Sequence, residues 1–242
     1  MLQIIRSELK KLKRLKILSI GIISIVLSHI ISIIQLTAMS QGKILFPALL
    51  DMNIWNNVTI ILPFTLTLIG GYIINKEHIE DTQKNIIVVP IKWSKVIEAK
   101  MITIFIYSLI LALLNSIILI CTGFFLQCSD ININSIIEAI TSLVIMQVCI
   151  YIGVLPIILF FSKSKGKYIW GTLFSMMVGI VGVFISNGKL VNWHPITTGF
   201  SIISYRMGND LYLNKAYSSV AIIIYIMLSC IIYMFYYKRN EY

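Results

Sequence analysis

Charged residues are scarce in this sequence. They make up 12% of its 242 residues, whereas hydrophobic residues make up 58%, and the mean hydropathy is +0.89. About a quarter of the residues of a typical soluble domain are charged. The deficit therefore excludes an ordinary soluble protein and predicts an integral membrane protein.

Several catalytic and nucleotide-binding patterns are also absent. The sequence contains no G-x-x-x-x-G-K-[ST] phosphate loop, no H-E-x-x-H zinc motif and no G-x-S-x-G serine motif. Three of its four cysteines lie in apolar runs and only Cys128 lies outside them, so we expect neither a disulfide nor a metal site. The chain is not expected to be an enzyme or to bind ATP by itself.

The sequence contains several long runs of apolar residues. A helix needs about 20 apolar residues to cross a bilayer, and six runs meet that length. They lie near residues 17–38, 57–74, 101–126, 136–161, 169–186 and 217–235. Because the runs are continuous rather than alternating, they predict spanning helices and not the strands of a barrel. We expect an all-α membrane protein with a single domain, 1–242.

The basic residues indicate how the chain is oriented. Sixteen of the 20 Lys and Arg residues would face one side of the membrane. They are Arg6, Lys10, Lys11, Lys13, Arg14, Lys16, Lys76, Lys84, Lys92, Lys95, Lys100, Lys163, Lys165, Lys167, Lys238 and Arg239. The positive-inside rule places that side, and both termini, in the cytoplasm. The net charge of +10 is then a topology signal, and no nucleic-acid partner is expected.

The first 16 residues form a pattern of their own. Leu2, Ile5, Leu9 and Leu12 recur at helical spacing, with basic residues on the other faces. The pattern predicts an amphipathic helix over residues 1–16 on the inner leaflet, in contact with membrane lipid. The alternative is a basic topology signal whose spacing is accidental.

Few polar residues interrupt the predicted spans. Glu138, near the outer end of the fourth, is the only acidic one, and it suits solvation at the interface better than a proton relay. His29, Gln35, Asn115 and Gln147 are interpreted as hydrogen-bonding groups between helices. An ion-coupled carrier is disfavoured because such carriers use more ionisable groups within the membrane and show internal repeats.

The connection between the second and third spans has an unusual composition. Its sequence EDTQKNIIVVPIKWSK, residues 80–95, is too charged to span a membrane and too apolar for an ordinary loop. A short amphipathic helix from Gln83 to Val89 would end near Pro90, because a proline disfavours the helical conformation of the residue before it. The apolar residues Ile86, Ile87, Val88 and Val89 then form either a docking surface for a partner or a contact with lipid headgroups.

This segment resembles the type-2 permease subunits of ATP-binding-cassette exporters. The residues that carry the resemblance are Glu77 or Glu80, Thr82, the run Ile86, Ile87, Val88 and Val89, then Pro90, Lys92 and Lys100. One departure is Asp81, where the family often has glycine. The resemblance implies that Glu80, Thr82 and residues 86–90 form a cytoplasmic coupling helix that docks into an ATPase subunit.

The rest of the chain supports the same resemblance. The family has six spans, a basic amphipathic start and short outer helices before the last span, where this sequence has Trp193, His194 and Pro195 followed by TTGFSIIS. The style of the second span is most similar to permeases of lantibiotic-immunity and peptide-antibiotic resistance exporters of the bacterial cell membrane. The alternative is an immunity or sensor scaffold that binds the peptide antibiotic without moving it.

The resemblance also implies the partners. They are two copies of a separate ATP-binding subunit, a second permease that is identical or related, and an amphiphilic peptide substrate. No cofactor is expected in this chain, because ATP and Mg²⁺ would bind the ATPase.

Small residues recur in the fifth predicted span. Gly171, Ser175 and Gly179 are spaced four apart, which gives a groove where another helix can approach closely. The approaching helix belongs either to the same chain or to a second permease.

Overall fold

The structure is a computed structural model. It describes residues 1–12, 15–39, 42–82, 92–186, 188–205 and 212–238. These residues form helices and their connections, and the described part of the chain contains no strand. The all-α prediction is confirmed.

Within the described ranges, six helical runs are long and apolar enough to span a membrane. They are α2 (Leu18–Met39), the continuous run of α3 (Phe46–Asn56), η1 (Asn57–Ile61) and α4 (Leu62–Ile79), then α6 (Trp93–Phe125), α7 (Ile133–Phe161), α8 (Tyr168–Ile185), and α10 (Lys215–Tyr233) with η4 (Met234–Lys238). Their number agrees with the six apolar runs of the sequence. The protein is a multi-pass membrane protein.

The second span is longer than the sequence predicts. It begins at Phe46 rather than near residue 57, and its 34 residues reach about 51 Å at 1.5 Å per residue. Pro47 lies in the first turn of α3. A proline is tolerated there because the backbone amides of the first turn have no partner within the helix. The polar residues Asn53 and Asn56 obscured this start in the sequence, but in the structure both are buried.

Those buried polar groups bond to the first and third spans. His29 of α2 lies 2.9 Å from the Asn115 side chain of α6 and 3.3 Å from that of Asn53. Asn56 donates to Gln35 at 2.8 Å. The predicted hydrogen bonding between helices is confirmed for these groups. Gln147 differs, because its buried side-chain nitrogen has no partner among the described residues.

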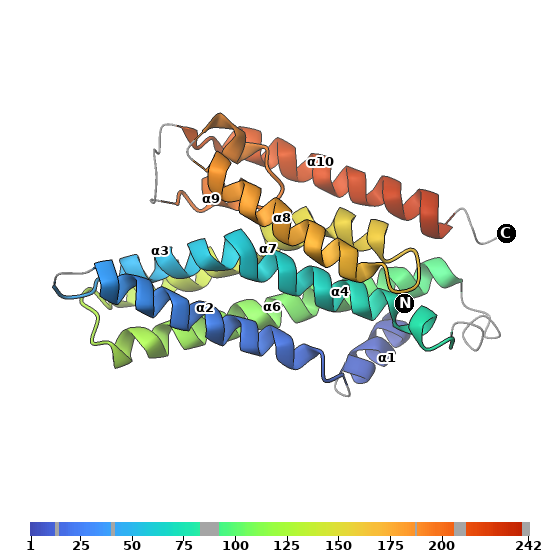
Figure 1. Ribbon diagram of the computed structural model, residues 1–242, viewed down its shortest axis with the longest axis horizontal. Helices are drawn as coiled ribbons and strands as arrows, with labels where there is room; N and C mark the ends of the chain where they lie inside the picture. Colours follow the sequence, from blue (N-terminus) through green and yellow to red (C-terminus); the bar gives the residue numbers. More distant parts are fainter. Residues whose placement is uncertain (13–14, 40–41, 83–91, 187, 206–211, 239–242) are drawn as a thin grey trace.

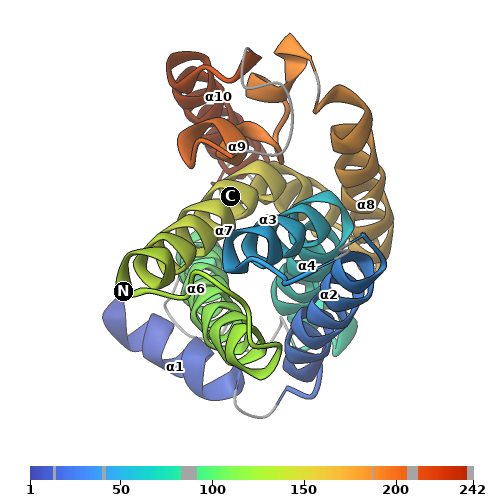
Figure 2. The same ribbon diagram turned by 90° about the vertical axis from the view of Figure 1, so that its left-hand side faces the viewer.

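The second span and α7 form the core of the bundle, while α10 lies at its edge. In the most apolar window of each span, 72% of the residues are buried in the second span, 67% in α7 and only 17% in α10. Figure 2 shows α10 and α8 on separate sides of α7. Most of the surface of α10 is therefore left for lipid or another chain.

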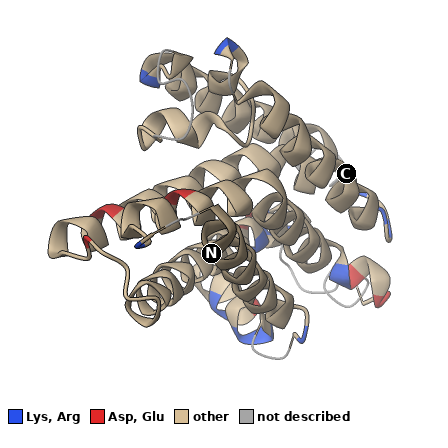
Figure 3. Cartoon of the chain, turned by 60° about the vertical axis from the view of Figure 1, so that its left-hand side comes forward, with Lys and Arg blue, Asp and Glu red and all other residues tan. Residues whose placement is uncertain are grey.

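The helix ends fall into two groups. In Figure 1, α1 (Leu2–Leu12), the end of α4, the start of α6 and the end of α10 lie at the right-hand end of the bundle. The short helices η2 (Lys189–Asn192) and α9 (Thr198–Ile202) lie at the opposite end, in the part of the chain where the family resemblance implies short outer helices. Figure 3 shows Lys and Arg gathered around α1 and the helix ends near it.

Candidate functional site

The predicted docking segment is described only at its margins. Glu80 and Thr82 follow α4 directly. The remaining predicted residues, Ile86, Ile87, Val88, Val89 and Pro90, lie outside the described residues. The described part of the site consists of the end of α4, the start of α6 and the residues that contact them.

A glycine-like turn ends α4. Asp81 has a left-handed backbone with φ of 53°, and the Thr82 amide donates to the Glu77 carbonyl oxygen at 3.0 Å. This is the bond pattern of a helix end that usually requires glycine. Aspartate is one of the few other residues that adopt the left-handed conformation. The departure from glycine at Asp81 therefore preserves the turn.

Polar contacts join this turn to the connection between α7 and α8. The Lys165 ammonium lies 2.9 Å from an Asp81 carboxylate oxygen, an exposed pair that adds little stability. The Asn75 side chain does more, because it is buried. Its amide nitrogen donates to the carbonyl oxygens of Ser162 and Ser164 at 2.8 Å each, and its oxygen accepts from the Gly166 amide at 2.8 Å.

Four charged residues meet beside the end of α4, and we name them the charge cluster: Glu8, Lys11, Glu77 and Lys100. Lys100 of α6 contacts a Glu77 oxygen of α4 at 2.5 Å and a Glu8 oxygen of α1 at 3.4 Å. Lys11 contacts the other oxygen of each carboxylate, at 2.5 Å for Glu8 and 3.4 Å for Glu77. Three elements are thus joined by alternating charges.

Three of the four residues of the charge cluster are buried, Lys11 is partly exposed, and the two positive charges balance the two negative ones. Lys100 is 1% exposed, and Glu8 and Glu77 are each 4% exposed. Lys100 also donates to the Ile73 carbonyl oxygen at 2.5 Å, so its ammonium has three acceptors. Burial by itself lowers the pKa of Lys11, but the Glu8 and Glu77 carboxylates outweigh it and raise the pKa above its ordinary value.

An aromatic contact links α4 and α6 on either side of the predicted docking segment. His78, near the end of α4, and Trp93, at the start of α6, lie with ring centroids 5.9 Å apart in an edge-to-face arrangement. Together with the Glu77–Lys100 pair, this contact fixes the distance that residues 83–91 must bridge. The margins of the predicted docking segment are therefore joined by two side-chain contacts.

Two weak signals of the charge cluster are visible in the sequence. Glu8 is the only acidic residue in the first 50, inside an otherwise basic helix, and Lys100 stands next to a long apolar run. Neither signal names a partner, because Glu8 and Lys100 lie far apart in the chain. Sequence analysis interpreted residues 1–16 as lipid-bound and missed their ionic contact with α4 and α6.

The small residues of α8 face the second span and α7 of the same chain. Ser175 donates to the Pro63 carbonyl oxygen at 3.1 Å, and a Cβ added at Gly179 would overlap the Thr59 carbonyl oxygen. Gly171 packs against Phe161 of α7. Other α8 side chains, Trp170, Phe174 and Met177 among them, are exposed.

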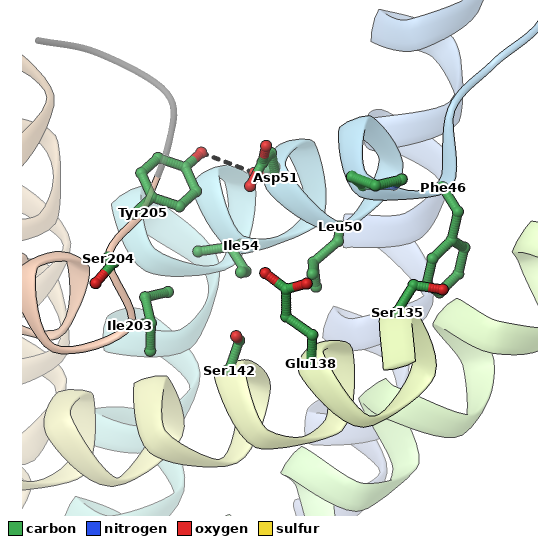
Figure 4. Close-up of a pocket in the computed structure, with 11 residues that line it drawn as sticks. Phe46, Leu50, Asp51, Ile54, Ser135, Glu138, Ser142, Ile203, Ser204 and Tyr205 are labelled. Atoms are coloured by element: carbon green, nitrogen blue, oxygen red, sulfur yellow. Dashed lines mark hydrogen bonds between the residues drawn. The ribbon is translucent and has the colours of Figure 1, made fainter. Parts of the chain in front are cut away.

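Glu138 lines a small pocket at the end of the bundle opposite α1. Figure 4 shows its side chain pointing toward α3, with Asp51 and Tyr205 across the pocket. The Tyr205 hydroxyl donates to the Asp51 carbonyl oxygen at 2.8 Å, which ties the residues after α9 to α3. Glu138 thus belongs to a polar surface at the helix ends and not to a path through the bundle.

Comparison with known proteins adds one finding. A family model described as "ABC-2 family transporter protein" matches residues 4–182. No curated protein and no solved structure matches the chain. The matched range covers more than half of the sequence and includes the charge cluster, most of α1, the first four spans and most of α8.

Proposed function

Because this chain belongs to the ABC-2 transporter family, whose members are membrane permeases that work with an ATP-binding subunit, we propose that it expels membrane-active peptides. The peptides would be of the lantibiotic or bacteriocin type, and the membrane that of a bacterial cell. The energy would come from ATP hydrolysis in separate subunits that hold ATP and Mg²⁺. Two such subunits and a second permease, identical or related, would complete the transporter.

The observation that carries the transport mechanism is the rigid mounting of the segment between α4 and α6. Its margins are held by the Glu77–Lys100 ion pair and the contact between His78 and Trp93. Asn75 and Asp81 connect the same place to the start of α8. A displacement of the segment by an ATPase would therefore move the inner ends of α4, α6 and α8 together. A non-transporting scaffold has no use for such a mounting.

The surface of the bundle supports a substrate that comes from the membrane. An almost wholly apolar crevice of about 440 Å³ opens between α7, α8 and α10. A second, of about 370 Å³, opens between α2, the second span and α8. Both open sideways and present apolar side chains, which suits amphiphiles held in a bilayer better than ions or sugars. Resemblance to peptide-resistance exporters favours peptides among these amphiphiles.

The function is tested by removing ATP hydrolysis. Cells that express the chain with its partners should survive a lantibiotic-like peptide and carry less of it on their surface than cells that lack the chain. Both effects should vanish when the partner ATPase is replaced by a hydrolysis-dead variant. A scaffold or sensor would bind peptide in either strain, so equal protection in both would overturn the exporter proposal.

Docking is tested separately. Replacing Ile87 and Val88 together by Asp should release the ATPase from the permease, because each buried aliphatic side chain contributes about 1.5–3 kcal/mol to an interface. The control is Asn132→Asp with Asn134→Asp, which adds the same charge at the N-terminal end of α7. Copurification of the ATPase at wild-type yield with the Ile87 and Val88 double variant would contradict the coupling role.

A further inference from the structure

The amphipathic helix α1 is fastened to the bundle by charges and not only by lipid. We propose that Glu8 and Lys100 are positioning residues that make α1 move with the ends of α4 and α6 during each ATPase cycle. This inference rests on the proposed function only in requiring an ATPase that docks between α4 and α6. It assigns α1 a part in power transmission that an inert lipid anchor would not have.

The geometry supports a rigid link. The Lys100 ammonium is enclosed by one oxygen from each of three groups: the Ile73 carbonyl, the Glu77 carboxylate and the Glu8 carboxylate. Lys11 bridges the same two carboxylates from the exposed side. Because each carboxylate has two lysine partners, α1 cannot turn or slide without separating opposite charges in a buried place.

Stability alone does not explain this arrangement. Burying a set of charges costs solvation energy that their attraction hardly recovers, and apolar replacements of such sets are often neutral or stabilising. In some proteins a buried polar or charged set instead fixes the register of a helix. The benefit of the charge cluster therefore lies in the position it gives α1.

The two faces of α1 differ in their burial, which shows which face contacts the bundle. Leu12 is buried and Leu9 packs on the core, while Leu2 and Lys10 are exposed. α1 thus lies at the edge of the bundle with a basic and apolar surface turned outward. In Figure 1 it crosses beneath the end of α4, beside the margins of the predicted docking segment.

Movement of α1 would reach the first span directly. α1 leads through residues 15–17 into α2, whose first residue, Leu18, accepts a hydrogen bond from the Tyr107 hydroxyl of α6 at 2.8 Å. Tyr107 also packs against Gly21 of α2. The start of α2 therefore follows α1 in the chain and is bonded to α6. α2 also borders one of the two apolar crevices.

The test measures the movement itself. Spin labels are placed at Ser7 on α1 and at Asn134 at the far end of the bundle, in a permease without its four cysteines that is assembled with its ATPase. The distance between the labels should differ between the nucleotide-free and ATP-trapped states. In the triple variant Glu8→Gln, Glu77→Gln and Lys100→Met, which leaves no buried charge unpaired, the difference should disappear while ATPase binding and thermal stability persist.

A second variant keeps the proposal falsifiable if the first one misfolds. The single change Glu8→Gln removes the negative charge of α1 while Lys100 keeps its pair with Glu77, and it should by itself abolish the nucleotide-dependent change in distance. An unchanged distance response in the triple variant would overturn the positioning role. If the labels respond as expected but no peptide is exported, the proposed substrate fails and the inference about α1 stands.

Discussion

Gly179 of α8 lies directly against the Thr59 carbonyl oxygen of the second span. This carbonyl stands in the π-helical turn η1, four residues before Pro63, which has no amide hydrogen to donate. Pro63 cannot donate the backbone hydrogen bond that an α-helix would form there. The wider π-helical turn η1 allows the second span to continue through this position as a helix. The close approach of α8 therefore occurs where the second span is already irregular.

Replacing Gly179 by Ala should loosen this contact. Overpacking of a tight site costs about 1–3 kcal/mol, because the added methyl group meets backbone and not a side chain that can turn away. We expect the midpoint of thermal unfolding in detergent to fall by several degrees. Gly188→Ala is the matched control, since a Cβ there meets its nearest atom at an ordinary 3.7 Å. Equal midpoints for the two variants would contradict the packing argument.

Asn75→Ala should free the connection between α7 and α8. The variant loses two bonds to carbonyl oxygens and one from an amide, all at 2.8 Å, and a buried group left without its partner costs about 1–3 kcal/mol. Trypsin should then cut faster after Lys163, Lys165 or Lys167 in vesicles that expose this connection. The exposed Asn134→Ala serves as control, and an unchanged cleavage rate for Asn75→Ala would argue against the anchoring role.

The helices were easier to predict from the sequence than their ends. Continuous apolar runs indicate spanning helices whatever the neighbours are, so all six were found. The start of the second span was missed because Asn53 and Asn56 indicate a polar connection when only the sequence is considered. Asn53 bonds to His29 and Asn115, and Asn56 bonds to Gln35. These partners belong to other helices, and a one-dimensional pattern does not place them beside the second span. The same limit hid the charge cluster.

Acidification should destabilise the connection before α10. Burial lowers the pKa of His194 to about 4, and its ring accepts a hydrogen bond from the Ile196 amide at 3.4 Å. Between the unfolded pKa of about 6.5 and this lowered value, the unfolded state binds the proton and the folded state does not. Stability is therefore complete above about pH 6.5 and declines as the pH falls toward 4.

The measurement for His194 is the unfolding midpoint at pH 7.5 and pH 5. The wild-type protein should lose more stability between these values than His194→Gln, which keeps a polar side chain but cannot take up the proton. Other groups titrate in both proteins, so the comparison concerns the difference between them. An identical pH response in the two proteins would show that His194 is not the responsible group.

The orientation of the chain is tested by labelling from outside. Single cysteines at Asn132, between α6 and α7, and at Ser164, between α7 and α8, are introduced into a protein without the native four. The excess of basic residues near Ser164 predicts a cytoplasmic position for it. An impermeant thiol reagent added to intact cells should therefore modify residue 132 and spare residue 164. Labelling of residue 164 but not of residue 132 would contradict the predicted orientation of the chain.

The charge cluster also constrains how the protein is made. Glu8 leaves the ribosome early, whereas Glu77 and Lys100 emerge only with the second and third spans. Until then α1 has no ionic partner in the bundle, and only its amphipathic character can keep it at the bilayer surface. Its ionic contact with the bundle therefore cannot be complete before Lys100, near the start of the third span, has been synthesised. A chain truncated before Lys100 would leave Glu8 without this partner.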